Sequence, residues 1–265
     1  LTQRDAVPAV SDTIKYDNVR MHGYEGNMNV GQRWSSPKKS LEDGRFLMYS
    51  STCWYFAEGL VDAELESAER HRAGGGGGDD AAAPTPIGLI HVSFGGSTIE
   101  SWLSASSLSK SEDVCYPDDV DGRGDGLRFS SLVLPYVNVT LAGWVWYQGE
   151  NNMGRENVCT LGNSLRHSGY SFLAMELIQS WRALWSATRG TTHPLAPFGA
   201  VALPSSGSEG NPEMGTMRWA QTGGYGVLPN IVAPNSYLVQ SNDVDDPYYR
   251  RYGGGDGDDA QRGWR

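Results

Sequence analysis

The sequence predicts an α/β fold with a mainly parallel sheet, and two observations lead to this class. Short apolar runs, typical of strands buried in a parallel sheet, occur at 87–92, 141–147 and 197–203. Segments with apolar residues at three- and four-residue spacing, typical of amphipathic helices, occur at 47–65 and 171–185. Strand and helix patterns that alternate along the chain are characteristic of α/β domains. A chain of 265 residues favours one domain.

The first third of the chain is expected to begin with a loop or other peripheral structure at 1–16 and a short strand at 18–22. Residues 23–39 are rich in Gly, Asn, Ser and Pro and predict a loop. The helix pattern that follows ends in a charged, solvated stretch, and its apolar face consists of Met48, Cys53, Phe56, Leu60, Val61 and Leu65. Residues 73–85 form a low-complexity insertion, which we expect to be a flexible surface segment.

The remaining two thirds show weaker helix signals between the strands. An acidic, Gly-rich loop is expected at 115–126, and a short helix at 127–139 is expected to break near Pro135. The run at 141–147 is the predicted central strand. The other expected elements are the helix 171–185, the strand 197–203, a helical turn at 214–221, a last strand at 237–240 and an acidic, Gly-rich tail at 243–265.

The composition argues against two classes of partner. The net charge is −10 and the basic residues are not clustered, whereas nucleic-acid binding needs grouped Lys and Arg. No apolar run approaches the roughly 20 residues that span a bilayer, so membrane insertion is not expected. The three cysteines, Cys53, Cys115 and Cys159, allow one disulfide with a leftover thiol or none, and their spacing predicts no metal site. The oligomeric state cannot be predicted from these features.

Two strand ends carry groups suited to chemistry. The stretch Gly143–Gly154 starts as an apolar strand and becomes polar at Gln148-Gly149-Glu150-Asn151-Asn152, which places amides and a carboxylate beyond the carboxyl end of a strand. Ligands of open α/β sheets bind at this edge. The turn Gly95-Gly96 follows the strand 87–92, and glycine lets the backbone approach a ligand closely and direct N–H groups at it. Such donors stabilise the oxyanion of acyl transfer.

These residues resemble the sialate O-acetylesterase family. The resemblance is carried by Pro86–Ile90, Phe94–Trp102 and Gly143–Asn152, where the family usually has Ser before the final Asn. Ile178–Arg182, Pro197–Gly199 and Arg218–Thr222 also fit in order and spacing. The resemblance implies an SGNH-type hydrolase, which is a three-layer α/β/α sandwich with a flavodoxin-like sheet. It also implies removal of acetyl esters from sugars such as sialic acids by a Ser nucleophile and a His base oriented by Asp, with no cofactor or metal, in a secreted or lysosomal protein.

Residue by residue, the resemblance implies an oxyanion and substrate side. Gly95 or Gly96 supplies a backbone N–H, and either Gln148 or Asn151 faces the oxyanion. The substrate-binding positions in the strand-end motif are Gly149, Glu150 and Asn152. Arg218 and Gln221, in the later stretch, are further substrate-binding candidates, with packing as the alternative role.

The family's nucleophile and base are not evident in this chain. Its Gly-Gln-Ser-Asn-Met pentapeptide does not occur, and none of the five histidines follows an Asp by three residues. Two hypotheses fit: the chain is an internal fragment of a working esterase, or it is a complete, catalytically inactive domain that binds glycans in the same crevice. A third, from another class, is an unrelated α/β binding or scaffold protein, which predicts an exposed apolar patch at Gly95 and Gln148.

Overall fold

The computed structural model describes residues 10–25, 33–74, 84–153, 164–204 and 212–240. The chain divides into two compact units, 1–95 and 96–265, and each is described by itself. The expectation of a single domain stays a prediction. The tail 243–265 and most of the insertion 73–85 lie outside the described residues.

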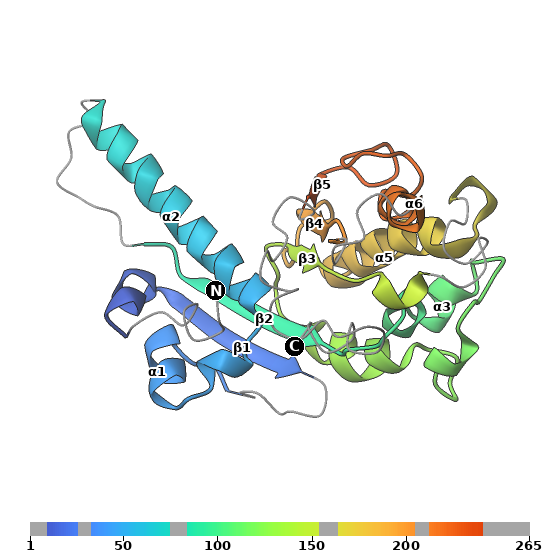
Figure 1. The fold of residues 1–265 in the computed structure, drawn as a ribbon, viewed down its shortest axis with the longest axis horizontal. Coiled ribbons are helices and arrows are strands. Elements are labelled where there is room, and N and C mark those ends of the chain that lie inside the picture. The colour runs from blue at the N-terminus through green and yellow to red at the C-terminus, as the bar shows by residue number, and fades with distance from the viewer. Residues whose placement is uncertain (1–9, 26–32, 75–83, 154–163, 205–211, 241–265) are drawn as a thin grey trace, which may run out of the picture. The chain divides into compact units, whose positions relative to one another are not determined.

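The first unit is built on a parallel pair of strands, β1 (Val19–Glu25) and β2 (Ile87–Ser93), paired from Val19 with Ile87 to Glu25 with Ser93 (Figure 1). The helical elements of this unit are η1 (Val10–Tyr16), α1 (Pro37–Glu42), η2 (Phe46–Met48) and α2 (Ser51–Ala73). Helix α2 begins where the Ser50 side chain accepts a hydrogen bond from the Cys53 N–H, at 3.3 Å. Its last turn is basic, which suits the negative end of the helix dipole.

Three predictions for the first unit need correction. The predicted apolar face of α2 is wrong in part, because Phe56, Leu60 and Leu65 are exposed and the buried side chains are Trp54, Ala57 and Val61. The Trp54 ring decides this face, since it contacts the rings of Tyr16 and Phe46 edge-on at 5.3 and 4.9 Å.

The predicted loop at 23–39 contains the end of β1 and the start of α1. The missed signal was Ser36-Pro37, because Ser36 caps the helix by accepting from the Lys39 N–H and Pro37 occupies the first turn. Strand β2 also differs from the expectation of burial on both faces: Leu89 and His91 are buried, and their neighbours are half-buried or exposed.

The second unit contains a three-stranded parallel sheet in the order β3 (Trp144–Trp146), β4 (Phe198–Val201), β5 (Ser236–Val239) (Figure 1). Its helices and helical turns are η3 (Ile99–Trp102), α3 (Ala105–Leu108), η4 (Pro117–Asp119), η5 (Phe129–Val133), η6 (Leu134–Tyr136), η7 (Glu150–Asn152), η8 (Ser164–Arg166), α5 (Gly169–Ser186) and α6 (Pro212–Ala220). The helix predicted at 127–139 is present as the two turns η5 and η6, which meet beside Pro135.

Helix α5 and the sheet share an aromatic core. The rings of Trp144 and Trp185 meet edge-on at 5.7 Å, as do those of Trp146 and Trp181. Buried Leu173 and Leu177 complete this face of α5. The expected amphipathic pattern needs correction in the first half of the helix, because every residue from 169 to 178 is buried. The α/β class and the parallel pairing are confirmed by these elements.

The strand predicted at 141–147 is shorter than expected and is not central among the described strands. It spans only 144–146 and lies at one edge of its sheet, with β4 in the middle. Before the strand, the Leu141 N–H donates to the Thr192 hydroxyl at 2.8 Å instead of to a sheet neighbour. Gly143 then lies so close to Pro197 that a Cβ there would come within 2.6 Å of the Pro197 carbonyl oxygen.

Candidate active site

The polar stretch after β3 is held by a buried amide network. Asn152 has no exposed surface and lies at its centre. Its Oδ1 accepts from the Ile99 N–H and from Gln148 Nε2, both at 2.9 Å. Its Nδ2 donates to Glu100 Oε2 at 3.0 Å. The turn η7 is therefore fixed to η3, the segment that follows the Gly96 turn.

Gln148 continues this network with both ends of its amide. Its Nε2 donates to the Ser97 carbonyl at 3.0 Å as well as to Asn152, so both amide hydrogens are used within the protein. Its Oε1 accepts from the Tyr170 hydroxyl at 3.0 Å, and the same hydroxyl lies 3.0 Å from the Gln148 carbonyl oxygen. Tyr170 is buried at the start of α5. Gln148 thus joins three segments and has no hydrogen left to donate to a ligand while these bonds hold.

Asn151 differs from its two neighbours because it is exposed. Its Nδ2 donates to the Gly96 carbonyl oxygen at 2.7 Å, and an amide nitrogen carries a second hydrogen. Gly96 has a φ of +80°, a left-handed conformation that glycine adopts without steric cost. The structure therefore brings together two of the predicted oxyanion residues, Gly96 and Asn151. Gly95 precedes this turn, and a Cβ added there would meet no atom within 4 Å.

Gly149 is the second glycine whose conformation the site requires. Its φ is +150°, and an added Cβ would lie 2.6 Å from Met217 Cε and 3.0 Å from Leu203 Cδ1. Both of those side chains have no exposed surface. Gly149 lets the chain turn into η7 over a packed core, so it shapes the site without offering a side chain to a ligand.

Two predicted substrate-binding residues on or beside α6 hold the end of β4. The Arg218 Nε donates to the Leu203 carbonyl at 2.8 Å, and Gln221 Oε1 accepts from the Leu203 N–H at 3.1 Å. Gln221 is buried, and its Nε2 donates to the carbonyls of Val201 at 2.9 Å and Gln148 at 3.3 Å. Gln221 therefore joins the ends of β3 and β4.

The two carboxyl groups of the site have different surroundings. Glu100 is buried, and burial raises its pKa, although the hydrogen bond from Asn152 acts in the opposite direction. Glu150 remains accessible to solvent, yet desolvation by the surrounding protein also raises its pKa. Glu100 is thus part of the supporting network, whereas Glu150 stands where a ligand can reach it.

The predicted set of site residues thus divides by position. Gly96, Glu150 and Asn151 lie at the surface of the turn region, whereas Gln148, Asn152 and Gln221 lie buried behind it. For Asn152 the structure corrects the expected position, because full burial leaves it no surface for substrate. Sequence analysis missed Glu100 and Tyr170 as network members. The available signal for Glu100 was a carboxylate in a short turn that begins with Ile99 and ends with Trp102.

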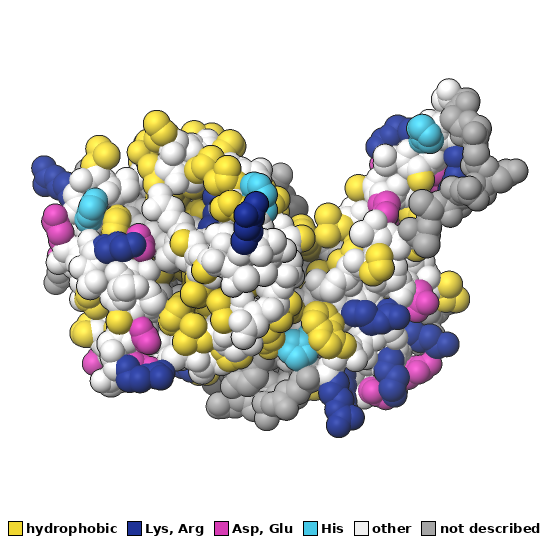
Figure 2. All heavy atoms as spheres, turned by 180° about the vertical axis from the view of Figure 1, so that it is seen from behind, with side chains coloured by type: hydrophobic (Ala, Val, Ile, Leu, Met, Phe, Trp, Pro, Cys, Tyr) yellow, Lys and Arg dark blue, Asp and Glu magenta, His cyan; other side chains and the backbone are white. Residues whose placement is uncertain are grey.

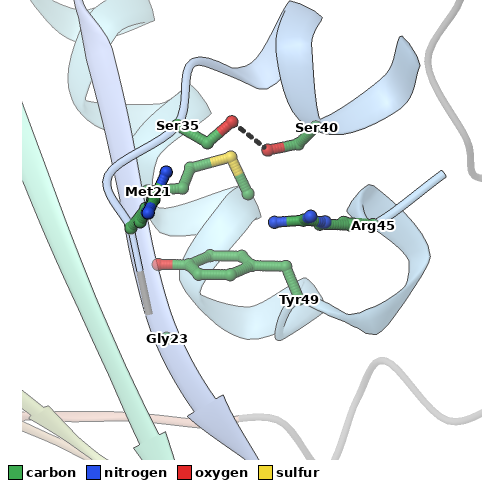
Figure 3. A pocket seen from close by; sticks show the side chains of 7 residues that line it. Met21, Gly23, Ser35, Ser40, Arg45 and Tyr49 are labelled. Atoms are coloured by element: carbon green, nitrogen blue, oxygen red, sulfur yellow. Dashed lines mark hydrogen bonds between the residues drawn. The ribbon is translucent and has the colours of Figure 1, made fainter. Parts of the chain in front are cut away.

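A small pocket in the first unit is a second place where side chains converge (Figure 3). The Tyr49 ring and Arg45 face Met21 there, and Ser40 donates to the Ser35 hydroxyl at 3.0 Å. A Cβ on Gly23 would lie 3.2 Å from the Tyr49 ring. This pocket is formed by packing around β1, and it contains none of the residues that the sequence singles out for chemistry.

The structure also locates two cysteines and tests for two other kinds of site. Cys115 is disulfide-bonded and Cys53 is a free thiol, so these two do not pair with each other. Across the described ranges, no group of three His, Cys, Asp or Glu side chains could hold a metal ion. The helices in those ranges include none that is both long and apolar enough to cross a bilayer.

Comparison with known proteins supports the family resemblance. No known protein-family model matches the chain. Over 260 residues the chain is 29% identical to the sialate O-acetylesterase of Pongo abelii and 28% identical to that of Homo sapiens. Each of these two alignments covers 91% of this chain and 44% of the relative. The Rattus norvegicus sialate O-acetylesterase is 28% identical, with 48% of its length covered. The chain therefore spans about half the length of these relatives.

A solved structure is similar as well. A carbohydrate acetylesterase from Xanthomonas citri superposes with a TM-score of 0.54 at 21% sequence identity. The alignment covers 92% of this chain and 46% of that one. This likeness concerns the fold and agrees with the α/β class that the sequence predicted.

Proposed function

We propose that this chain forms the oxyanion and substrate side of an ester hydrolase that removes O-acetyl groups from sialic acids or related acetylated sugars. Ser, His and Asp would carry the reaction from outside this chain. The observation that carries the proposal is the contact between Asn151 Nδ2 and the Gly96 carbonyl, at 2.7 Å, because it joins two strand-end turns at the surface. The curated relatives named sialate O-acetylesterase support the reaction class.

Within this proposal, Asn151 is the side chain that donates to the oxyanion. Its amide is exposed and fixed by one hydrogen bond, which leaves its second hydrogen for a ligand. The Gly96 backbone N–H is the proposed second donor. Preorganised donors of this kind stabilise the negative charge that develops on the carbonyl oxygen during acyl transfer. Gln148 and Asn152 are positioning residues, because they act on the substrate only through the turn that they hold.

The proposed sugar-binding surface includes Trp219 on α6. Its side chain is 55% exposed, and the ring lies against the backbone of Gly226, where an added Cβ would be 2.6 Å from it. The Thr222 hydroxyl accepts from the Gly226 N–H at 2.7 Å and donates to the Trp219 carbonyl, which keeps this loop in place. A flat aromatic ring held in this way offers a surface on which the apolar face of a sugar ring can stack.

A catalytically inactive glycan-binding domain is the second candidate, since the nucleophile and base are not evident in this sequence. The polar network around Gln148 favours the esterase and the glycan-binding domain over a scaffold that binds through an apolar patch. A secreted or lysosomal location is also proposed, and the disulfide at Cys115 supports it because structural disulfides form in oxidising compartments.

The test is acetate release from an O-acetylated sialic acid by the protein that carries this chain. Asn151→Ala should lower kcat about 10²–10³-fold, as loss of one oxyanion donor does in other acyl-transfer enzymes. Gln179→Ala is the matched control: Gln179 is also an exposed amide, and its Nε2 donates to a backbone carbonyl, that of Val232, at 3.0 Å. Equal rates in the two variants would refute the role of Asn151. Sugar binding without hydrolysis in the unaltered protein would favour the glycan-binding candidate.

A further inference from the structure

The segment Asn138-Val139-Thr140 is an Asn-X-Thr sequon that the proposed function does not use, and it lies within the described residues. All three residues are exposed, just after the turn η6. The backbone is held in a turn there, because the Val139 N–H donates to the Tyr136 carbonyl at 2.9 Å. The Val139 carbonyl accepts from Trp185 Nε1 at 3.1 Å. The backbone of the sequon is thus anchored while Asn138 stays exposed to solvent.

The disulfide at Cys115 is independent evidence that the chain folds in an oxidising compartment. Disulfides form and persist where the environment is oxidising, which in a eukaryotic cell includes the compartment where N-linked glycans are attached. The 265-residue sequence contains this single Asn-X-Ser/Thr tripeptide. A chain that forms its disulfide there therefore presents one accessible acceptor.

The sequon lies at the opposite end of β3 from the candidate active site. Residues 138–140 precede the strand, and the polar stretch from Gln148 follows it. The same end of the sheet includes Pro197, whose carbonyl accepts from the Trp144 N–H, and Leu195, whose carbonyl accepts from Asn235 Nδ2 at 2.6 Å. Leu195 is 45% exposed, and the side chains of Val139 and Leu134 are also exposed. Figure 2 shows hydrophobic side chains at the surface of this unit.

We propose that Asn138 is a site of N-linked glycosylation. In the transfer, the side-chain nitrogen of Asn138 forms a bond to the first carbon of the sugar. The amide loses one proton, and the lipid-linked diphosphate that carried the sugar leaves. The glycan covers exposed apolar surface at the amino end of the sheet and leaves the carboxyl end, with Asn151 and Gly96, open to substrate.

The experiment expresses the chain behind a signal peptide in cultured human cells and analyses both medium and cell lysate. Gel mobility is compared before and after treatment with peptide-N-glycosidase F. Mass spectrometry of the tryptic peptide 129–155 then tests for the Asn-to-Asp conversion that this enzyme leaves at a glycosylated Asn138. Asn138→Gln and Thr140→Ala each remove the sequon, whereas Thr140→Ser retains it and controls for the change at that position.

The expected result is a single mobility shift on deglycosylation, present in the unaltered chain and in Thr140→Ser and absent in the other two variants. Acetate release, where the protein shows it, should be the same before and after deglycosylation. An unmodified peptide 129–155 from both medium and lysate would overturn the proposal. A shift that persists in Asn138→Gln would also overturn it. Neither outcome depends on whether the chain is part of an esterase.

Discussion

Replacing Gly149 by alanine tests the packing that shapes the site. The new Cβ would lie 2.6 Å from Met217 Cε and 3.0 Å from Leu203 Cδ1, two side chains with no exposed surface. Overpacking of this kind costs about 1–3 kcal/mol. A non-glycine residue at a φ of +150° costs about 1–3 kcal/mol more. The free energy of unfolding should therefore fall by roughly 2–6 kcal/mol, a large part of the typical roughly 5–15 kcal/mol of a domain.

Urea unfolding followed by tryptophan fluorescence measures this change, because the core of the second unit contains Trp144, Trp146, Trp181 and Trp185. Gly215→Ala is the matched control. Gly215 lies within α6, where an added Cβ meets no atom within 4 Å and alanine favours a helix by about 0.5–1 kcal/mol. We expect a loss of stability for Gly149→Ala and none for Gly215→Ala. Equal midpoints for Gly149→Ala and the unaltered protein would refute it.

Three further predictions concern the pH dependence of stability, a thiol and the turn at Gly96. Burial raises the pKa of Glu100 above its unfolded value, so the folded state holds its proton more tightly and stability falls as the pH rises from about 4.5 through the raised pKa. In Glu100→Gln the loss of stability with rising pH should be smaller. Urea unfolding midpoints of both proteins between pH 4 and 7 test this, and midpoints that fall equally with pH in the two proteins would contradict it. Burial raises the pKa of Cys53 to about 11, so little of this thiol is ionised at pH 8 in the folded protein. Iodoacetamide at pH 8 should therefore label Cys53 at least about tenfold more slowly in the folded than in the urea-unfolded protein. Mass spectrometry measures the two labelling rates, and equal rates would contradict the prediction. Gly96→Val should strongly reduce turnover because valine is strained at a φ of +80°, and a folded variant with unchanged turnover would remove Gly96 from the proposed oxyanion site.

The sequence predicted the strong elements of the fold because each had a clear period or an apolar run. Helix α5 and the strands β2 and β4 lie where the patterns place them. The buried face of α2 was predicted poorly, since its apolar residues spread around the helix and only the ring contacts of Trp54 determine which side is covered. Helix α1 was missed because it is too short for a periodic pattern, and its only signal in the sequence was the capping residue Ser36.

For the candidate site, the sequence proposed a set of residues but could not tell which of them are buried and which are exposed. Gln148, Asn151 and Asn152 lie within five consecutive residues. The sequence alone does not tell which of these three amides is exposed to a ligand. The turn η7 separates them, because it directs Asn152 into the core and leaves Asn151 at the surface. Such a division depends on contacts with Ser97, Ile99 and Glu100, about fifty positions earlier in the chain, and no local pattern carries that information.

The most direct test of the account is the rate of acetate release from an O-acetylated sialic acid, measured for the protein that carries this chain and for its Asn151→Ala variant. We expect hydrolysis by the unaltered protein and a kcat about 10²–10³-fold lower in the variant, with unchanged unfolding midpoints. Hydrolysis at the same rate in both proteins would contradict the assignment of Asn151. Binding of the sugar by the unaltered protein without any release of acetate would contradict the esterase function itself.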